Sequence, residues 1–415
     1  MRLATCLVAA AWLSISFSQC GRGGDWPQIL GPDRNGVAAP DERLDPQWPA
    51  DGPAQLWKLP VGRGFAGVAV VGETAILFDR VAGSERVQAL SIHDGSPRWT
   101  KTYSTNFVPQ YGRDDGPMSV PSVADGAVVT FGAEGLLMCS ELDSGKERWR
   151  HDTKAEFDAL EGFFGAGSSP LIDSGKIYVN VGGRQQQAGI VCFELATGKV
   201  LWKSVEDGAS YSSPIIARLG GRRRLIALTR LKCVVLDPDT GEVAAEFPYG
   251  LRGPTVTAAN PLVVSDRLFL SASYGIGARL IKFGGGEPQT VWDSNDLMSS
   301  QYTTCIEHKG LLYGVDGRQD IPPASLRCFD PVSQNVKWTA RGSGYATLIK
   351  ADNKLLVMKT DGTLILAALD SDAYQELAKA EVFQETVRAL PALSNGRLYV
   401  RDGHTLKCLD LRADR

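Results

Sequence analysis

The sequence predicts an all-β protein, an eight-bladed β-propeller of four-stranded antiparallel blades whose ring is closed by the N-terminal strand. Three observations carry this prediction. A turn glycine followed four residues later by tryptophan recurs along the 415-residue chain. The copies follow one another at intervals of about 40–50 residues, the range typical of propellers and solenoids. An incomplete unit at each end of the chain supplies what the other lacks.

The clearest copy begins at Cys192, turns at Gly198 and continues to Trp202. Glycine adopts the positive φ that a tight hairpin turn needs. We expect each tryptophan to lie on the outermost strand and to pack against a neighbouring blade, because repetition at one register indicates packing rather than catalysis. The expected docking positions are Trp57, Trp99, Trp149, Trp202, Trp292 and Trp338, with Phe247 (or its neighbour) and Leu377 in two degenerate copies.

Each unit contains four short runs rich in β-branched residues, separated by glycine turns, as between Ser169 and Lys203. Helical periodicity is nearly absent, and four antiparallel strands per unit favour a propeller over a solenoid. Residues 388–411 supply three strands without a fourth, and residues 54–60 supply a fourth strand alone. Pairing them closes the ring and removes exposed strand edges.

The ends of the chain predict the domain organisation and the compartment. Residues 1–20 have a positive start and an apolar run too short to span a bilayer, which predicts a secretion signal. Cys20 offers a site for a lipid anchor. Residues 21–53 are expected to form an extended arm and residues 54–415 the propeller. We therefore expect an exported protein of the periplasm or cell envelope, with no internal membrane span.

Composition and scattered polar residues argue against several kinds of chemistry. A net charge of −3 is too small to suggest nucleic acid as a partner. Four histidines without metal-ligand spacing give no metal site. Cysteines 139, 192, 328 and 408 share one register, so equivalent points lie roughly 10 Å apart, beyond the ~7 Å that a disulfide spans. Cys233 and Cys305 cannot be paired from sequence. No catalytic, cofactor-binding or metal-binding residue is predicted.

The repeat resembles a known family. Ser144–Trp149 and Thr197–Trp202 are similar to the tryptophan-docking repeat of the PQQ-like eight-bladed propellers, and the likeness covers nearly the whole mature chain. The resemblance implies one of two classes. One is the quinoprotein dehydrogenases, which use pyrroloquinoline quinone and calcium. The other has no catalytic machinery and is similar to the propeller lipoprotein of the outer-membrane β-barrel assembly complex. Asp25–Gly36 resembles the start of a group of secreted bacterial PQQ-repeat proteins.

The dehydrogenase class typically has an adjacent cysteine pair on the quinone, and this sequence has none. Its calcium-binding acidic residues match no position here. Asp237–Glu242 has clustered oxygens but occupies the turn of the repeat. The resemblance therefore favours a binding or assembly scaffold without a cofactor, with a quinone-dependent dehydrogenase and a glycan-binding propeller as the alternatives.

Long loops are expected on one face of the disc, where outer strands connect to inner strands and second strands to third strands. Aromatic residues and arginines gather in these loops, as they do at protein interfaces. An alternative is that the aromatics only anchor the loops. The expected partner-binding face, for a protein of the cell envelope, comprises Tyr111, Arg113, Phe163, Phe164, Arg184, Arg252 and Arg318.

Overall fold

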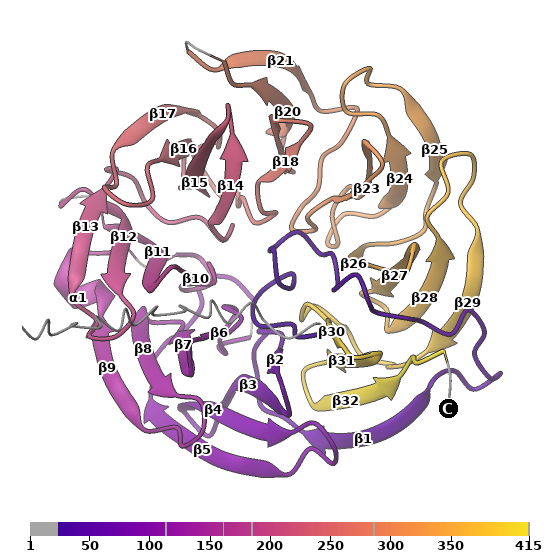
Figure 1. The fold of residues 1–415 in the computed structure, drawn as a ribbon, viewed down its shortest axis with the longest axis horizontal. Helices are drawn as coiled ribbons and strands as arrows, with labels where there is room; N and C mark the ends of the chain where they lie inside the picture. The colour runs from indigo at the N-terminus through magenta and orange to yellow at the C-terminus, as the bar shows by residue number, and fades with distance from the viewer. Residues whose placement is uncertain (1–23, 113, 161, 184–185, 285–286, 414–415) are drawn as a thin grey trace, which may run out of the picture.

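A computed structural model describes residues 24–112, 114–160, 162–183, 186–284 and 287–413. It contains eight four-stranded antiparallel sheets set around one axis (Figure 1). The predicted fold class is therefore confirmed. One short helix, α1 (Thr153–Phe157), interrupts the all-β pattern, and Asp152 caps it by accepting a hydrogen bond from the backbone N–H of Ala155. This helix lies in a loop for which the sequence predicts no regular structure.

The strands follow one another from the axis to the rim in each blade. The first four blades are β2 (Ala69–Val71), β3 (Thr74–Val81), β4 (Ser84–Ser91) and β5 (Pro97–Ser104); β6 (Ser122–Ala124), β7 (Ala127–Phe131), β8 (Leu136–Glu141) and β9 (Glu147–Asp152); β10 (Leu171–Asp173), β11 (Lys176–Gly183), β12 (Ala188–Glu194) and β13 (Val200–Ser204); and β14 (Ile215–Leu219), β15 (Arg222–Leu228), β16 (Lys232–Leu236) and β17 (Val243–Pro248).

The other four blades repeat this order. They are β18 (Leu262–Val264), β19 (Arg267–Ala272), β20 (Gly277–Lys282) and β21 (Gln289–Ser294); β22 (Ile306–His308), β23 (Leu311–Asp316), β24 (Ser325–Phe329) and β25 (Val336–Ala340); β26 (Ala346–Ala351), β27 (Lys354–Lys359), β28 (Thr363–Ala368) and β29 (Glu376–Glu381); and β30 (Ala392–Ser394), β31 (Arg397–Arg401) and β32 (Thr405–Asp410), completed by β1 (Ala54–Pro60).

The N-terminal strand closes the ring. β1 pairs antiparallel with β32, with Trp57 opposite Cys408. Figure 1 shows this junction where the indigo strand β1 lies beside the yellow strand β32. The two incomplete units at the ends of the sequence therefore form one blade, as predicted.

Each docking tryptophan binds the blade that follows its own. The indole N–H of Trp99 donates to the backbone carbonyl of Leu142 over 2.7 Å, and the ring covers the turn glycine Gly145, where a Cβ would lie 2.6 Å from it. The glycine is thus needed both for the turn and as the surface on which the preceding tryptophan packs. The full set of indole bonds runs from Trp57 to Ile92, Trp99 to Leu142, Trp149 to Leu195, Trp202 to Pro238, Trp292 to Pro331 and Trp338 to Asp370.

The two degenerate positions predicted from sequence are wrong. Ala245 pairs with Val235 at the register where Trp202 pairs with Cys192 in the preceding blade, so Ala245 rather than Phe247 takes the docking position. In the seventh blade Ala378 takes it, and Leu377 is 36% exposed. Strand alternation turns Leu377, the neighbour of Ala378, away from the next blade. Phe247 lies two residues after Ala245 on the same face and packs against the core shared with the fifth blade, outside the docking register.

We expect Trp292→Ala to destabilise the protein by about 3–5 kcal/mol, because a large buried side chain is replaced by a cavity. Trp292 is only 7% exposed, and its indole bond is buried. Trp202→Ala, at a half-buried tryptophan with a longer indole bond of 3.3 Å, should cost less. Chemical denaturation of both variants measures the difference. Equal destabilisation would contradict the link to burial.

The six cysteines that the structure describes are all buried and free. The prediction that the four in-register cysteines form no bridges is therefore confirmed, and Cys233 and Cys305 are also unbridged. Burial raises the pKa of Cys139 to about 11 and that of Cys192 to about 12. These thiols stay protonated at neutral pH and act as small apolar core residues.

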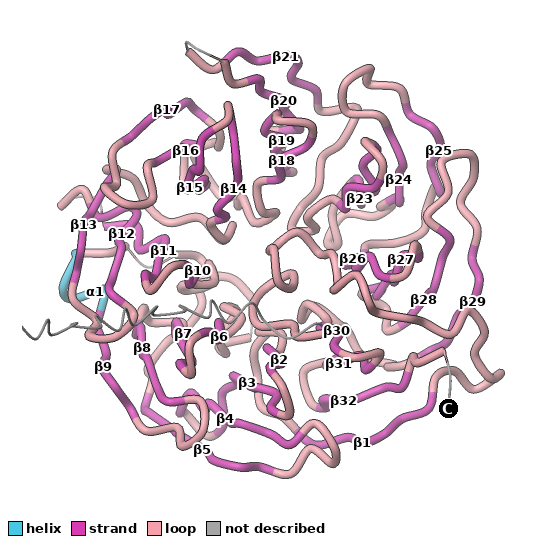
Figure 2. The backbone as a smooth tube through the Cα atoms, viewed as in Figure 1, coloured by secondary structure: helices cyan, strands magenta, loops and turns pink. Residues whose placement is uncertain are grey.

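The N-terminal arm does more than lead into β1. It forms bridges at Trp26 with Val70, Val37 with Lys350 and Leu44 with Arg412, all near the short turns of one face. In Figures 1 and 2 it starts at the axis and crosses blades seven and eight toward the rim. We call this face the turn face, and the opposite face, with the long outer-to-inner and second-to-third-strand connections, the loop face. The predicted signal sequence and Cys20 lie outside the described residues.

Candidate binding cavity at the centre of the loop face

A cavity of about 400 Å³ opens on the loop face at the propeller axis. Its volume lies within the ~300–1,000 Å³ typical of ligand sites. One position of the repeat, four residues before the inner strand begins, contributes seven of the seventeen residues that line it. Seven blades each contribute that residue: Phe65, Met118, Gly167, Tyr211, Ala258, Tyr302 and Arg388. In the remaining blade, Tyr345 is buried and its ring makes a tilted contact with Tyr302, with centroids 4.5 Å apart.

Two residues after this lining position, a second position of the repeat connects neighbouring blades by hydrogen bonds. The backbone N–H of Val120 donates to the hydroxyl of Ser169, that of Ser169 to Ser213, and that of Ser213 to the amide oxygen of Asn260. The N–H of Asn260 donates to Thr304 in turn. These side chains therefore hold the inner strands in place, in agreement with the interpretation of the serines before proline as repeat residues rather than nucleophiles.

The arm provides the floor of the cavity. Ile29 lines it, and Ile29 and Leu30 pack against Val120 and Leu390. Beside this floor, the guanidinium of Arg34 donates to the carbonyls of Ser169 and Pro170, both over 2.8 Å. Arg34 is 2% exposed, and burial lowers its pKa to about 9, so it is cationic at neutral pH. The cavity is thus closed toward the turn face.

One side of the rim is aromatic. Tyr111 meets Phe163 with ring centroids 5.4 Å apart and Phe164 at 6.4 Å, and Phe164 meets Tyr211 at 5.8 Å. The hydroxyl of Tyr211 accepts a hydrogen bond from the backbone N–H of Phe164 over 2.8 Å, which fixes the loop that carries both phenylalanines. Such edge and tilted contacts are the preferred arrangements of aromatic rings.

The other side is polar. The side-chain amide of Gln301 donates to Tyr274 and to Asp320, both over 3.0 Å, and its oxygen accepts from the N–H of Gln319. The hydroxyl of Tyr302 donates to the amide oxygen of Gln319 over 3.1 Å. These bonds fix the orientation of both amides, because each amide oxygen already faces a donor.

Two arginines of this side have different roles. Arg318 forms an ion pair with Asp320 and stacks on Tyr274, 4.1 Å from the ring centroid. Its hydrogen bond holds the pKa of Asp320 below its usual value, so the carboxylate is ionised and neutralised. Arg388 stacks on Phe65 at 5.2 Å and makes no hydrogen bond or ion pair with any residue that the structure describes. It is the uncompensated cation of the cavity.

The structure brings some of the sequence-predicted face residues together. Tyr111 and Phe164 line the cavity, Phe163 adjoins them, and Arg318 braces its polar wall. Arg252 is exposed on the loop after β17, outside the cavity lining. Arg113 and Arg184 lie outside the described residues. Sequence reasoning missed Phe65, Tyr211, Tyr274, Gln301, Gln319 and Arg388, although the first, second and last share the repeat position named above.

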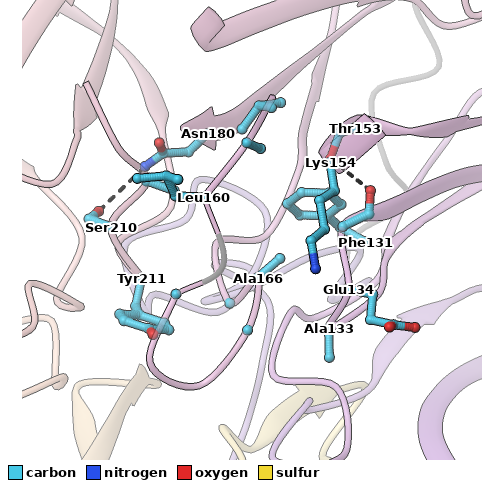
Figure 3. Close-up of a pocket in the computed structure, with 17 residues that line it drawn as sticks. Phe131, Ala133, Glu134, Thr153, Lys154, Leu160, Ala166, Asn180, Ser210 and Tyr211 are labelled. Atoms are coloured by element: carbon cyan, nitrogen blue, oxygen red, sulfur yellow. Dashed lines mark hydrogen bonds between the residues drawn. The ribbon is translucent and has the colours of Figure 1, made fainter. Parts of the chain in front are cut away.

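A second, smaller pocket lies between blades two and three (Figure 3). It measures about 50 Å³, room for water rather than for a ligand. Asn180 faces Ser210 across it at 3.4 Å, and its amide oxygen is buried without a partner. Thr153 donates to the carbonyl of Gly135. The residues that line this pocket form the base of the loop that carries Phe163 and Phe164.

The cavity does not fit a calcium ion. Asp320 is the one carboxylate among the described residues that line it, and Arg318 and Gln301 occupy its oxygens. No group of three or more candidate ligands occurs anywhere in the described part of the chain. The described lining of the cavity therefore offers no set of carboxylates for the calcium of the dehydrogenase class.

Eight blades, six of them docked by tryptophans, around an axial cavity define the class of PQQ-like repeat propellers. The family model described as outer membrane protein assembly factor BamB matches residues 83–340, more than half of the chain. The chain belongs to this family. The comparison with curated proteins gives no match.

Solved structures share the fold at low identity. The crystal structure of BamB from Moraxella catarrhalis has a TM-score of 0.61 at 16% identity, over 87% of this chain and 98% of that one. A europium-containing methanol dehydrogenase has a TM-score of 0.65 at 11% identity, over 91% and 89%. The computationally designed Ika8 protein reaches 0.58 at 13% identity, over 86% and 99%. A BamB, a methanol dehydrogenase and a designed protein thus share this fold, so the fold alone does not decide the function.

Proposed function

We propose that this protein is a non-catalytic scaffold of the cell envelope, exported to the periplasm, that binds a protein partner through its loop face. The observation that carries the proposal is the distribution of exposed apolar side chains. Among the large apolar residues that the structure describes, the four that are more than half exposed all lie in loop-face connections: Val108 at 76%, Ile321 at 59%, Leu160 at 53% and Tyr111 at 52%. Exposed apolar side chains that gather on one face, as these four do, favour an interaction site there.

The family also supports a scaffold role in the cell envelope, because its description names an outer membrane protein assembly factor. No helix in the part of the chain that the structure describes is long and apolar enough to cross a membrane. A lipid at Cys20 would hold the propeller at a membrane surface. Intact-mass measurement of the exported protein tests this, since a lipid adds mass at a new N-terminal cysteine.

Site-specific photo-crosslinking in living cells tests the binding face. A photoreactive amino acid at Val108 or Ile321 should give an adduct with the same protein, because both positions border one face. Leu201 on β13 and Val291 on β21 are the controls, as they are apolar and 41% and 46% exposed on the rim. Adducts at the rim positions without adducts at the loop face would show that the face is wrongly assigned.

The expectation that no quinone is used stays a prediction. Since the cavity offers no free carboxylate for calcium, pyrroloquinoline quinone with calcium should not support dye-linked alcohol oxidation. The measurement compares purified protein with and without both additives. Turnover that depends on calcium would overturn the scaffold proposal in favour of a dehydrogenase.

A further inference from the structure

We propose that the central cavity binds the C-terminal residue of a polypeptide, holding its free carboxylate at Arg388 and its large apolar side chain against the aromatic wall. This inference rests on the proposed function, in that the occupant belongs to a protein partner. It specifies which part of that partner enters the propeller, and by which chemistry.

The shape of the cavity favours a chain end. Ile29 and Leu30 of the arm, with Val120 and Leu390, close the axis below the cavity. An extended chain therefore cannot pass through the ring. A side chain or a terminus can enter from the loop face, where the half-exposed Tyr111 lines the cavity.

The polar groups of the cavity select an acceptor. The amide oxygens of Gln301 and Gln319 already accept hydrogen bonds, and both carboxylate oxygens of Asp320 do as well. Two groups that can only donate remain, the guanidinium of Arg388 and the amide NH₂ of Gln319, and neither donates to any described residue. The tyrosine hydroxyls of the lining can donate or accept. An occupant that satisfies them must bring acceptor oxygens.

Charge makes that acceptor an anion. Arg318 lies outside the lining and neutralises Asp320, so the described lining and Arg318 together carry one net positive charge, that of Arg388. Arg34 adds a second cation beside the floor, with no carboxylate partner among the described residues. A carboxylate bound by arginine forms short, strong hydrogen bonds, and the guanidinium can bind both of its oxygens.

The walls then require an apolar group next to the carboxylate. Phe65, Tyr111, Phe164 and Tyr211 line the side of the cavity away from the glutamines. Because Arg388 stacks on Phe65, its guanidinium lies directly beside this wall. A C-terminal residue with a large apolar side chain carries both features on one Cα. A neutral sugar matches the cavity less well, since it brings no negative charge to the guanidinium of Arg388.

Fluorescence anisotropy with labelled decapeptides tests the inference. The probe ends in phenylalanine with a free carboxylate, and its matched control is the same peptide with an amidated C-terminus. We expect the free peptide to bind roughly ten- to a hundredfold more tightly, the effect of a charge-assisted hydrogen bond. Arg388→Gln should remove this difference, whereas Arg252→Gln, an exposed arginine of the same face outside the cavity, should preserve it.

Equal binding of the free and amidated peptides would overturn the inference, and so would an unchanged preference in Arg388→Gln. Competition with pyrroloquinoline quinone alone distinguishes a small anion: if the quinone displaces the peptide at far lower concentration than unlabelled peptide does, the site belongs to a small molecule. If no peptide binds while the Val108 and Ile321 adducts persist, the inference fails and the proposed function stands. Loss of those adducts refutes the proposed function itself.

Discussion

Deletion of residues 54–61 is expected to destabilise the whole propeller, so that the variant no longer shows a cooperative unfolding transition at the melting temperature of the intact protein. The deletion removes β1, so the last blade loses its outer strand and β32 becomes an exposed edge. It also removes Trp57, which is 7% exposed and donates to Ile92 in the first blade. Loss of a large buried aromatic costs about 3–5 kcal/mol by itself, a large share of the roughly 5–15 kcal/mol that stabilises a typical domain.

Because the deletion also shortens the connection to the arm, a point variant separates the two effects. Trp57→Ala keeps the arm and the strand but loses the contact between the first and last blades, and it should lower the melting temperature clearly. Leu56→Ala on the same strand is the control, since Leu56 is 37% exposed. Melting of the deletion variant at the temperature of the intact protein would mean that ring closure contributes nothing.

The sequence predicts the ring well because its signal is repeated. Glycine and tryptophan at one spacing, as in Gly145 and Trp149, mark the same hairpin and the same docking contact in each copy. Where the tryptophan is missing, the prediction fails, as with Phe247 and Leu377. There the register depends on a bulge and on strand alternation, which the apolar character of one residue does not reveal.

The cavity is harder to predict, because its residues meet only around the axis. Phe65, Tyr211 and Arg388 share one repeat position, but they differ in chemistry and are far apart in sequence. Aligning the units on the start of the inner strand would have brought them together. The polar wall has no such signal, since the orientation of Gln301 and Gln319 depends on hydrogen bonds between two loops.

The arm illustrates the same limit. Its composition indicates an extended segment, and nothing in residues 24–44 alone shows that they close the axis. The arm is held at the axis by contacts that are distant in sequence. Arg34 donates to the carbonyls of Ser169 and Pro170, which are 135 and 136 residues away in the chain. A buried arginine bonded only to neutral oxygens is uncommon, which makes this residue a sensitive test of how the arm is held.

We expect Arg34→Ala to destabilise the protein by about 2–5 kcal/mol. The substitution leaves the backbone carbonyls of Ser169 and Pro170 without their hydrogen-bond donor. Each buried acceptor that loses its partner costs roughly 1–3 kcal/mol. Arg34→Lys should recover only part of this loss. The lysine ammonium keeps the charge and can donate, but it cannot bind two carbonyls in the bidentate geometry of a guanidinium. Chemical denaturation gives the free energies of unfolding.

A second measurement separates release of the arm from general unfolding. Trypsin cleavage at Arg43, an exposed residue of the arm, should accelerate in Arg34→Ala under conditions where the blades stay folded, because the arm then detaches locally. The matched control is Arg267→Ala, an arginine on β19 that makes only an exposed bond to Ser265. If Arg34→Ala and Arg267→Ala show the same stability and the same cleavage rate, the arm is held by its apolar contacts at Trp26 and Leu44, and the buried guanidinium has no part in closing the axis.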